Sequence, residues 1–153
     1  MQFTRRHMIR LAIATPAVAA FTPAAFAATP PVYANDGIAV DGSDVVAYFT
    51  QRAPVAGNPE ITFDYMGATW QFSSTENRDL FAADPSSYAP QYGGYCAYAV
   101  SHGTTASTVP EAWSIVDDKL YLNFSRRIKR RWNRDPETYI AAADANWPAV
   151  LSA

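Results

Sequence analysis

The sequence predicts an α+β fold, in which antiparallel β-hairpins pack with short helices in a single domain. Two stretches combine alternating apolar residues with a central turn signal, which is typical of hairpins. Other stretches begin with residues that cap helices. Strands and helices do not alternate in the β–α–β order that produces a parallel sheet, so we expect antiparallel pairing.

Residues 1–27 have the pattern of an export signal. Arg5 and Arg6 lie in a basic segment, a short apolar stretch with two prolines follows, and a small-x-small motif ends at Ala27. The adjacent arginines are typical of twin-arginine signals, which export folded proteins. We therefore expect a periplasmic or secreted protein whose mature chain has no transmembrane span.

The remaining 126 residues are enough for one domain with a hydrophobic core. Residues 28–35 contain two prolines and predict an extended leader, and residues 36–153 predict the folded domain. Without the signal, nine basic residues stand against 14 acidic ones, a net charge of −5. An acidic exported protein is not expected to bind nucleic acid.

The first half of the domain predicts one hairpin with loops before it and a helix after it. Residues 41–50 begin with an Asp-Gly turn signal, and Ser43 or Asp44 is placed to cap a short helical turn. Residues 51–60 contain two prolines and a glycine and predict a loop. Residues 61–72 alternate around a Met-Gly turn and predict the hairpin.

After residue 72, the sequence predicts three helices, each with a recognisable start signal, and a second hairpin. The stretch Ser73–Glu76 fits a capping box, and Asp84-Pro85 ends that helix. Residues 113–124 predict a second hairpin, with an Asp-Asp turn followed by Leu120, Leu122 and Phe124. Further helices are expected from Ser125, with Ile128 and Trp132 on one face, and from Asp135-Pro136 to about residue 150.

The stretch QYGGYCAYAVSHG contains the single cysteine of the chain, Cys96, and the single histidine after the signal, His102. A structural zinc site needs four protein ligands, which this inventory does not supply. A soft copper site remains open, because thiolate and imidazole are suitable ligands. However, a spacing of six residues on one helix would place the two side chains on opposed faces.

Two other interpretations of Cys96 remain open. If the Gly93-Gly94 pair bends the chain so that Cys96 begins a helix, the thiol pKa is lowered and a redox or nucleophilic role follows. Alternatively, Cys96 is a small buried side chain packed among the neighbouring tyrosines, Tyr92, Tyr95 and Tyr98.

The stretch RRIKRRWNR concentrates six of the nine mature positive charges in nine residues. One interpretation is a solvated helix held by its apolar stripe. The other is a surface for an anionic partner. The six cations are Arg126, Arg127, Lys129, Arg130, Arg131 and Arg134.

Several of these motifs together resemble the YHS domain, a small module found in metal-handling proteins. They are YMGATWQF at 65–72, DPSSY at 84–88, YGGYCAYAV, PEAW, KLYLNF, RRW and ANWP, and the later ones are similar to exported stand-alone YHS proteins. Cysteines typical of metal-associated members are replaced by Ser73 and Asn77, and the early one near residues 44–47 is absent. The resemblance at Cys96 implies redox or soft-metal chemistry.

Three functional hypotheses follow. The first is a binding protein rather than an enzyme, which handles copper, another soft metal ion or a metal-containing partner. Cys96 and His102 would be the ligands, in a pocket with walls formed by Tyr92, Tyr95 and Tyr98. The second is a thiol redox protein that uses Cys96 with a thiol from a partner protein. The third is a non-catalytic adaptor that uses the basic stretch 126–134.

Overall fold

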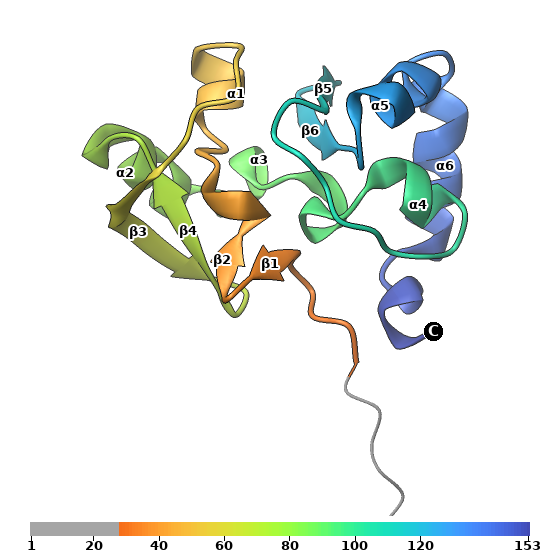
Figure 1. Cartoon of the computed structure of the whole chain (residues 1–153), viewed down its shortest axis with the longest axis horizontal. Coiled ribbons are helices and arrows are strands. Elements are labelled where there is room, and N and C mark those ends of the chain that lie inside the picture. Colours follow the sequence, from red (N-terminus) through yellow and green to blue (C-terminus); the bar gives the residue numbers. More distant parts are fainter. Residues whose placement is uncertain (1–27) are drawn as a thin grey trace, which may run out of the picture.

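The computed structural model describes residues 28–153 and has the predicted α+β class (Figure 1). The export signal predicted for residues 1–27 lies outside the described residues and stays a prediction. In chain order the elements are β1 (Ala34–Asn35), β2 (Ile38–Ala39), α1 (Ala47–Thr50), β3 (Asn58–Tyr65), β4 (Ala68–Phe72), α2 (Thr75–Ala83), α3 (Pro85–Tyr88), α4 (Ala97–Ser101), β5 (Trp113–Val116), β6 (Lys119–Leu122), α5 (Arg126–Trp132) and α6 (Pro136–Asn146). Short 3₁₀ turns occupy Val40–Gly42, Gln91–Gly94 and Ala149–Ser152.

The larger sheet has the strand order β1-β2-β4-β3 and contains the first predicted hairpin. Strands β3 and β4 pair in antiparallel fashion around Met66 and Gly67, which have φ angles of 50° and 79°. Such left-handed angles match the twist of a tight hairpin turn. Strand β2 pairs with β4 in parallel through Ile38 and Thr69, so the expectation of purely antiparallel pairing is wrong at this one position.

The start of α2 corrects one detail of the predicted capping box. Ser74 is the cap, and its hydroxyl accepts a hydrogen bond from the backbone N–H of Asn77 at 3.1 Å. Asn77 therefore occupies the position that Glu76 was expected to fill. Its side-chain amide donates to Asp44 at 2.8 Å instead of reaching back to the cap.

Asp44 is a fully buried carboxylate that joins three elements of the sheet half. Its Oδ1 accepts from the backbone N–H groups of Val46 and Ala47 at the start of α1, as the sequence predicts for a cap. Its Oδ2 accepts from the N–H and hydroxyl of Ser73 and from Asn77. Five donors thus compensate for the burial of this charge.

Two hydrophobic clusters lie side by side, and the hairpin of β5 and β6 contributes to both. Leu120 and Leu122 pack in the first cluster with the sheet and α2, whereas Tyr121 packs in the second with α4, α5 and α6. Successive residues of a strand point to opposite faces, so one strand serves both clusters. The hairpin turns at Asp117 and Asp118, as predicted, and both have left-handed φ angles.

The last two helices begin where the sequence predicts. Ser125 accepts from the N–H of Ile128 at 3.2 Å, and Asp135 accepts from that of Thr138 at 3.2 Å. Trp132 is fully buried and stacks against Tyr121, with ring centroids 5.1 Å apart. Helix α6 ends at Asn146, about four residues before the predicted end. Pro148 explains the early end, because proline disfavours a helical residue before it.

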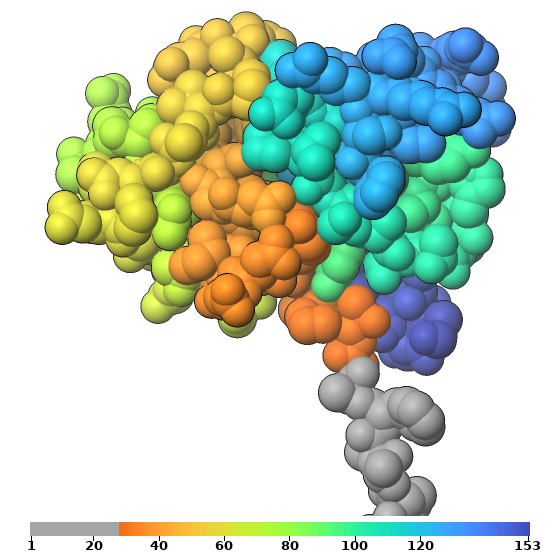
Figure 2. Space-filling model, viewed as in Figure 1, coloured from red at the N-terminus to blue at the C-terminus, as the bar shows by residue number. Residues whose placement is uncertain are grey.

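The leader at residues 28–35 docks across both halves of the molecule (Figure 2). The N–H of Thr29 donates to the carbonyl of Leu151 at 3.0 Å, and the N–H of Tyr33 donates to the carbonyl of Gly93 at 2.9 Å. The hydroxyl of Tyr95 donates to the carbonyl of Pro30 at 2.9 Å. Across residues 28–153, no helix has both the length and the apolar character needed to cross a bilayer.

Candidate functional site

Cys96 lies at the N-terminal cap of α4, the helix start that the glycine pair predicts. Gly93 and Gly94 have φ angles of 62° and 85°, which turn the chain sharply before the helix. Gly93 is also close to the leader, because a Cβ there would lie 1.8 Å from the carbonyl oxygen of Pro31. The backbone position expected to activate the thiol is therefore present.

The surroundings of the Cys96 sulfur oppose activation. The residue is only 1% exposed, and its Sγ accepts from the backbone N–H of Phe124 at 3.2 Å. The thiol faces the Oδ1 of Asn123, which is fully buried, at 3.6 Å. Burial raises the pKa of the Cys96 thiol, and nearby backbone N–H groups, those of Ala99, Phe124 and Tyr98, offset this only in part. The thiol is consequently protonated at neutral pH and shielded from reagents.

The three tyrosines do not face one pocket around the sulfur. The hydroxyl of Tyr92 donates to the carboxylate of Asp144 at 2.8 Å, and burial, followed by Asp144, raises the Tyr92 pKa. Tyr95 points to the leader, and both rings pack near Trp147, with centroids 5.9 and 6.4 Å away. Tyr92 and Tyr95 therefore serve the packing of the second cluster.

His102 lies at the other end of α4, where it is exposed. Its Nδ1 is 2.7 Å from the carbonyl oxygen of Tyr98, and its ring stacks on the Tyr98 ring at a centroid distance of 4.3 Å. Six residues of helix separate Cys96 and His102 by about 9 Å along the axis. In the part of the chain that the structure describes, no three His, Cys, Asp or Glu side chains cluster to hold a metal. The predicted ligands thus do not fit a shared metal ion.

The second candidate is the basic surface, which we define as the six cations on and just after α5. Five of these side chains are exposed, and Lys129 is half-buried. Among residues 28–153 none of the six forms an ion pair with a carboxylate, whereas Arg78 and Asp79 do so at 3.0 Å. The residues of the basic surface are Arg126, Arg127, Lys129, Arg130, Arg131 and Arg134.

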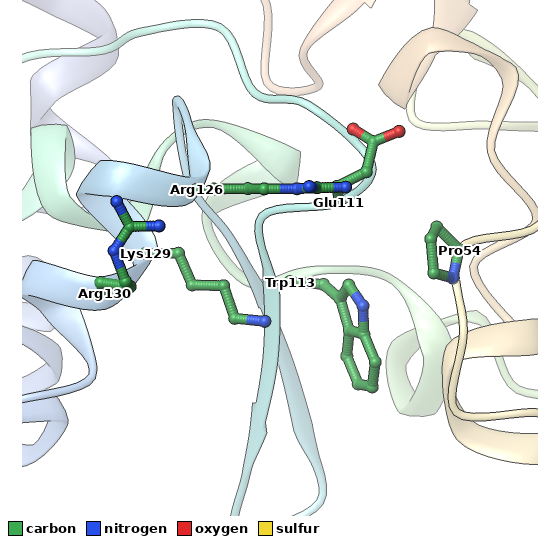
Figure 3. A pocket seen from close by; sticks show the side chains of 6 residues that line it. All are labelled: Pro54, Glu111, Trp113, Arg126, Lys129 and Arg130. Carbon is green, nitrogen blue, oxygen red and sulfur yellow. The ribbon is translucent and has the colours of Figure 1, made fainter.

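One flank of α5 borders a hollow of about 350 Å³, which we call the Trp113 hollow (Figure 3). The Lys129 ammonium lies over the indole ring of Trp113, 5.3 Å from its centroid. Pro54, from the loop before β3, faces the ring across the hollow, and Glu111 is the one acidic residue among those that line it. The remaining lining residues are Arg126 and Arg130.

A second hollow of about 680 Å³, the Phe124 hollow, borders the next flank of α5. Phe124 is 52% exposed there, and the Arg131 guanidinium lies 5.8 Å from the centroid of the Tyr98 ring. The predicted hairpin extends to Phe124, whereas β6 ends at Leu122, so Phe124 lies outside the strand and its alternation. Its lining residues are Phe124, Ser125, Arg127, Ile128, Arg130, Arg131 and Arg134.

Two cations of the basic surface, Lys129 and Arg131, are thus positioned by aromatic faces. A cation–π contact orients a side chain without cancelling its charge, unlike an ion pair. The surface therefore keeps its full positive charge beside two exposed apolar patches. Sequence reasoning found the cations but missed the contributions of Pro54, Glu111 and Phe124, which are distant in sequence or outside a regular element.

Comparisons of this chain with protein-family models, curated proteins and solved structures find no match. The resemblance to YHS domains consequently stays a prediction from the sequence. Two regions of the molecule remain as candidates for function: the shielded thiol, and the basic surface, which forms no ion pair within residues 28–153.

Proposed function

We propose that this protein is an exported, non-catalytic binding module that holds an anionic partner on the basic surface. One observation carries the proposal: six cations within nine residues line two adjacent hollows and have no carboxylate partners among the described residues. Like charges this close repel one another, and a partner that brings negative charge relieves the repulsion.

The identity of the cations also supports a binding role. Five of the six are arginines, whose planar guanidinium groups recognise carboxylates and phosphates through paired hydrogen bonds. The rest of the mature chain is acidic, with three further basic residues against 14 acidic ones. An anionic partner is therefore directed to α5, because the remaining surface repels it.

Chemistry at Cys96 has less support as a function. Metal handling requires converging ligands, and redox exchange requires an accessible thiolate. Cys96 is instead buried and its pKa is raised, while His102 occupies the opposite end of α4. The resemblance to YHS domains therefore bears on the fold of this proposal and not on its function, which we assign to the basic surface.

The test uses fluorescence anisotropy with labelled polyglutamate and compares two triple charge reversals. The first replaces Arg127, Arg131 and Arg134 with glutamate. The second replaces the three cations of residues 28–153 that lie outside the basic surface, Arg52, Arg78 and Lys119, with glutamate. Both variants have the same net charge, and thermal unfolding followed by circular dichroism verifies that each is folded.

We expect wild-type binding that weakens as salt is raised, since salt screens exposed charges. The first variant should lose at least about tenfold in affinity, whereas the second should stay within about threefold of wild type, as surface pairs each contribute modestly. Equal weakening by both variants would show that net charge alone governs binding, and the proposal would then be wrong.

A further inference from the structure

We infer that the anionic partner is an extended acidic segment of another protein, with two apolar side chains that flank its carboxylates. This inference rests on the proposed function and specifies the partner of the same surface. Its basis is the combination of two hollows, each with an apolar patch, on neighbouring flanks of one short basic helix.

Arg130 is the feature that joins the two hollows, because it lines both. Each hollow offers an apolar contact: the Trp113 ring and Pro54 in one, and the Phe124 ring with Ile128 in the other. A ligand that occupies both hollows must therefore pass over Arg130 with negative charge. An anion without apolar groups would leave both aromatic patches exposed to water.

The spacing of the hollows matches an extended polypeptide. A helix with its side chains is about 10 Å across, so anchors on its two flanks lie roughly that far apart. An extended segment in the polyproline II conformation advances about 3.1 Å per residue with three residues per turn, so side chains three positions apart share a face and lie about 9 Å from each other. The predicted motif is an apolar residue, two acidic residues and a second apolar residue.

A flexible chain fits this surface better than a membrane does. Successive helix residues are rotated by about 100°, so the five cations within α5 spread over about 200° of its circumference, and Ile128 and Trp132 occupy the remainder. A flat lipid surface meets only one side of such a helix, whereas a peptide wraps over several.

The test compares three labelled peptides in identical Gly-Ser flanks, by fluorescence anisotropy with the full chain. They contain Phe-Glu-Glu-Phe, the charge-matched Ser-Glu-Glu-Ser, and Phe-Phe-Glu-Glu, which has the first peptide's composition in another order. Phosphatidylglycerol vesicles serve as the lipid probe in a sedimentation assay. The variant Phe124→Ser removes one anchor, and Met66→Ser, with similar exposure of 50% against 52%, is its matched control.

We expect Phe-Glu-Glu-Phe to bind about tenfold more tightly than either other peptide, because buried aromatic anchors dominate such interfaces. Phe124→Ser should abolish this preference, and Met66→Ser should leave it intact. Equal binding of all three peptides, or binding to vesicles alone, would overturn this inference while the proposed function survives. If neither polyglutamate, peptides nor vesicles bind, both proposals are wrong.

Discussion

The reactivity of Cys96 distinguishes most directly between thiol chemistry and a packing role. We predict that the native protein reacts very slowly with a soluble disulfide reagent such as Ellman's reagent. Cys96 is 1% exposed, and its sulfur contacts the Asn123 side chain and the Phe124 backbone. The reagent can therefore attack only after this part of the structure opens.

The size of the effect follows from the opening equilibrium. If opening costs about 5 kcal/mol, the lower end for a small domain, the thiol is accessible about once in 5,000 molecules. Native Cys96 should then react about 5,000-fold more slowly than the same residue in the unfolded chain. The raised pKa of Cys96 has the same origin, because the burial that excludes the reagent also disfavours the thiolate.

The raised pKa of Cys96 also determines how the contribution of this residue to stability changes with pH. Between the ordinary thiol pKa and the raised native one, the unfolded chain releases the proton and the native chain keeps it. The contribution of Cys96 to stability is thus intact below pH 9.0 and is lost as pH rises beyond it.

The assay measures the absorbance of released thionitrobenzoate at pH 7 for native protein and for protein in guanidinium chloride. Cys96→Ser serves as the blank in both conditions. A native rate within about tenfold of the unfolded rate would refute the reasoning, because an opening cost below about 1.4 kcal/mol does not describe a buried thiol. The redox hypothesis would then replace the packing interpretation.

Two further predictions concern positions that hold the fold together. Asp44→Asn places an amide N–H₂ against either the two backbone donors of α1 or the donors of Ser73 and Asn77, and should lower the free energy of unfolding, measured in urea, by about 3 kcal/mol or more. The control, Asp79→Asn at an exposed position, should change it by less than about 0.5 kcal/mol. An equal effect of the two variants would contradict the role assigned to Asp44. Gly93→Ala forces a Cβ to within 1.8 Å of the leader and should lower the free energy of unfolding by well over about 1 kcal/mol. Roughly 1 kcal/mol is expected for the control Gly37→Ala, where φ is also left-handed but no atom lies within 4 Å of the added Cβ. Thermal unfolding of both variants measures the difference, and equal losses of stability would mean that the leader moves aside freely.

The parts of the fold that sequence predicted well are those set by local chemistry. Ser125 and Asp135 cap their helices because their oxygens reach N–H groups only three residues away. The Met66-Gly67 turn is similarly local, since two left-handed residues suffice to reverse a strand.

The contacts that sequence could not predict join distant residues. Asp44 meets Ser73 and Asn77 from 29 and 33 positions away, and Cys96 meets Asn123 from 27 positions away. No periodicity encodes such pairs, because they depend on how complete elements pack. The same holds for the candidate site. The cations are consecutive or nearly consecutive in the sequence and could be predicted from it, whereas the hollows beside them form only when distant segments pack together.

The docking of the leader determines where the two ends of the described chain lie relative to the basic surface. Thr29 is hydrogen-bonded to Leu151, so the first described residues and the C-terminal turn emerge together at the end of the molecule remote from α5 (Figures 1 and 2). A label or surface attachment at Ala153 would hold the protein with its arginine-rich side facing outward. Such an orientation suits immobilised binding assays, and it leaves room for a bulky partner to approach without meeting the anchored end.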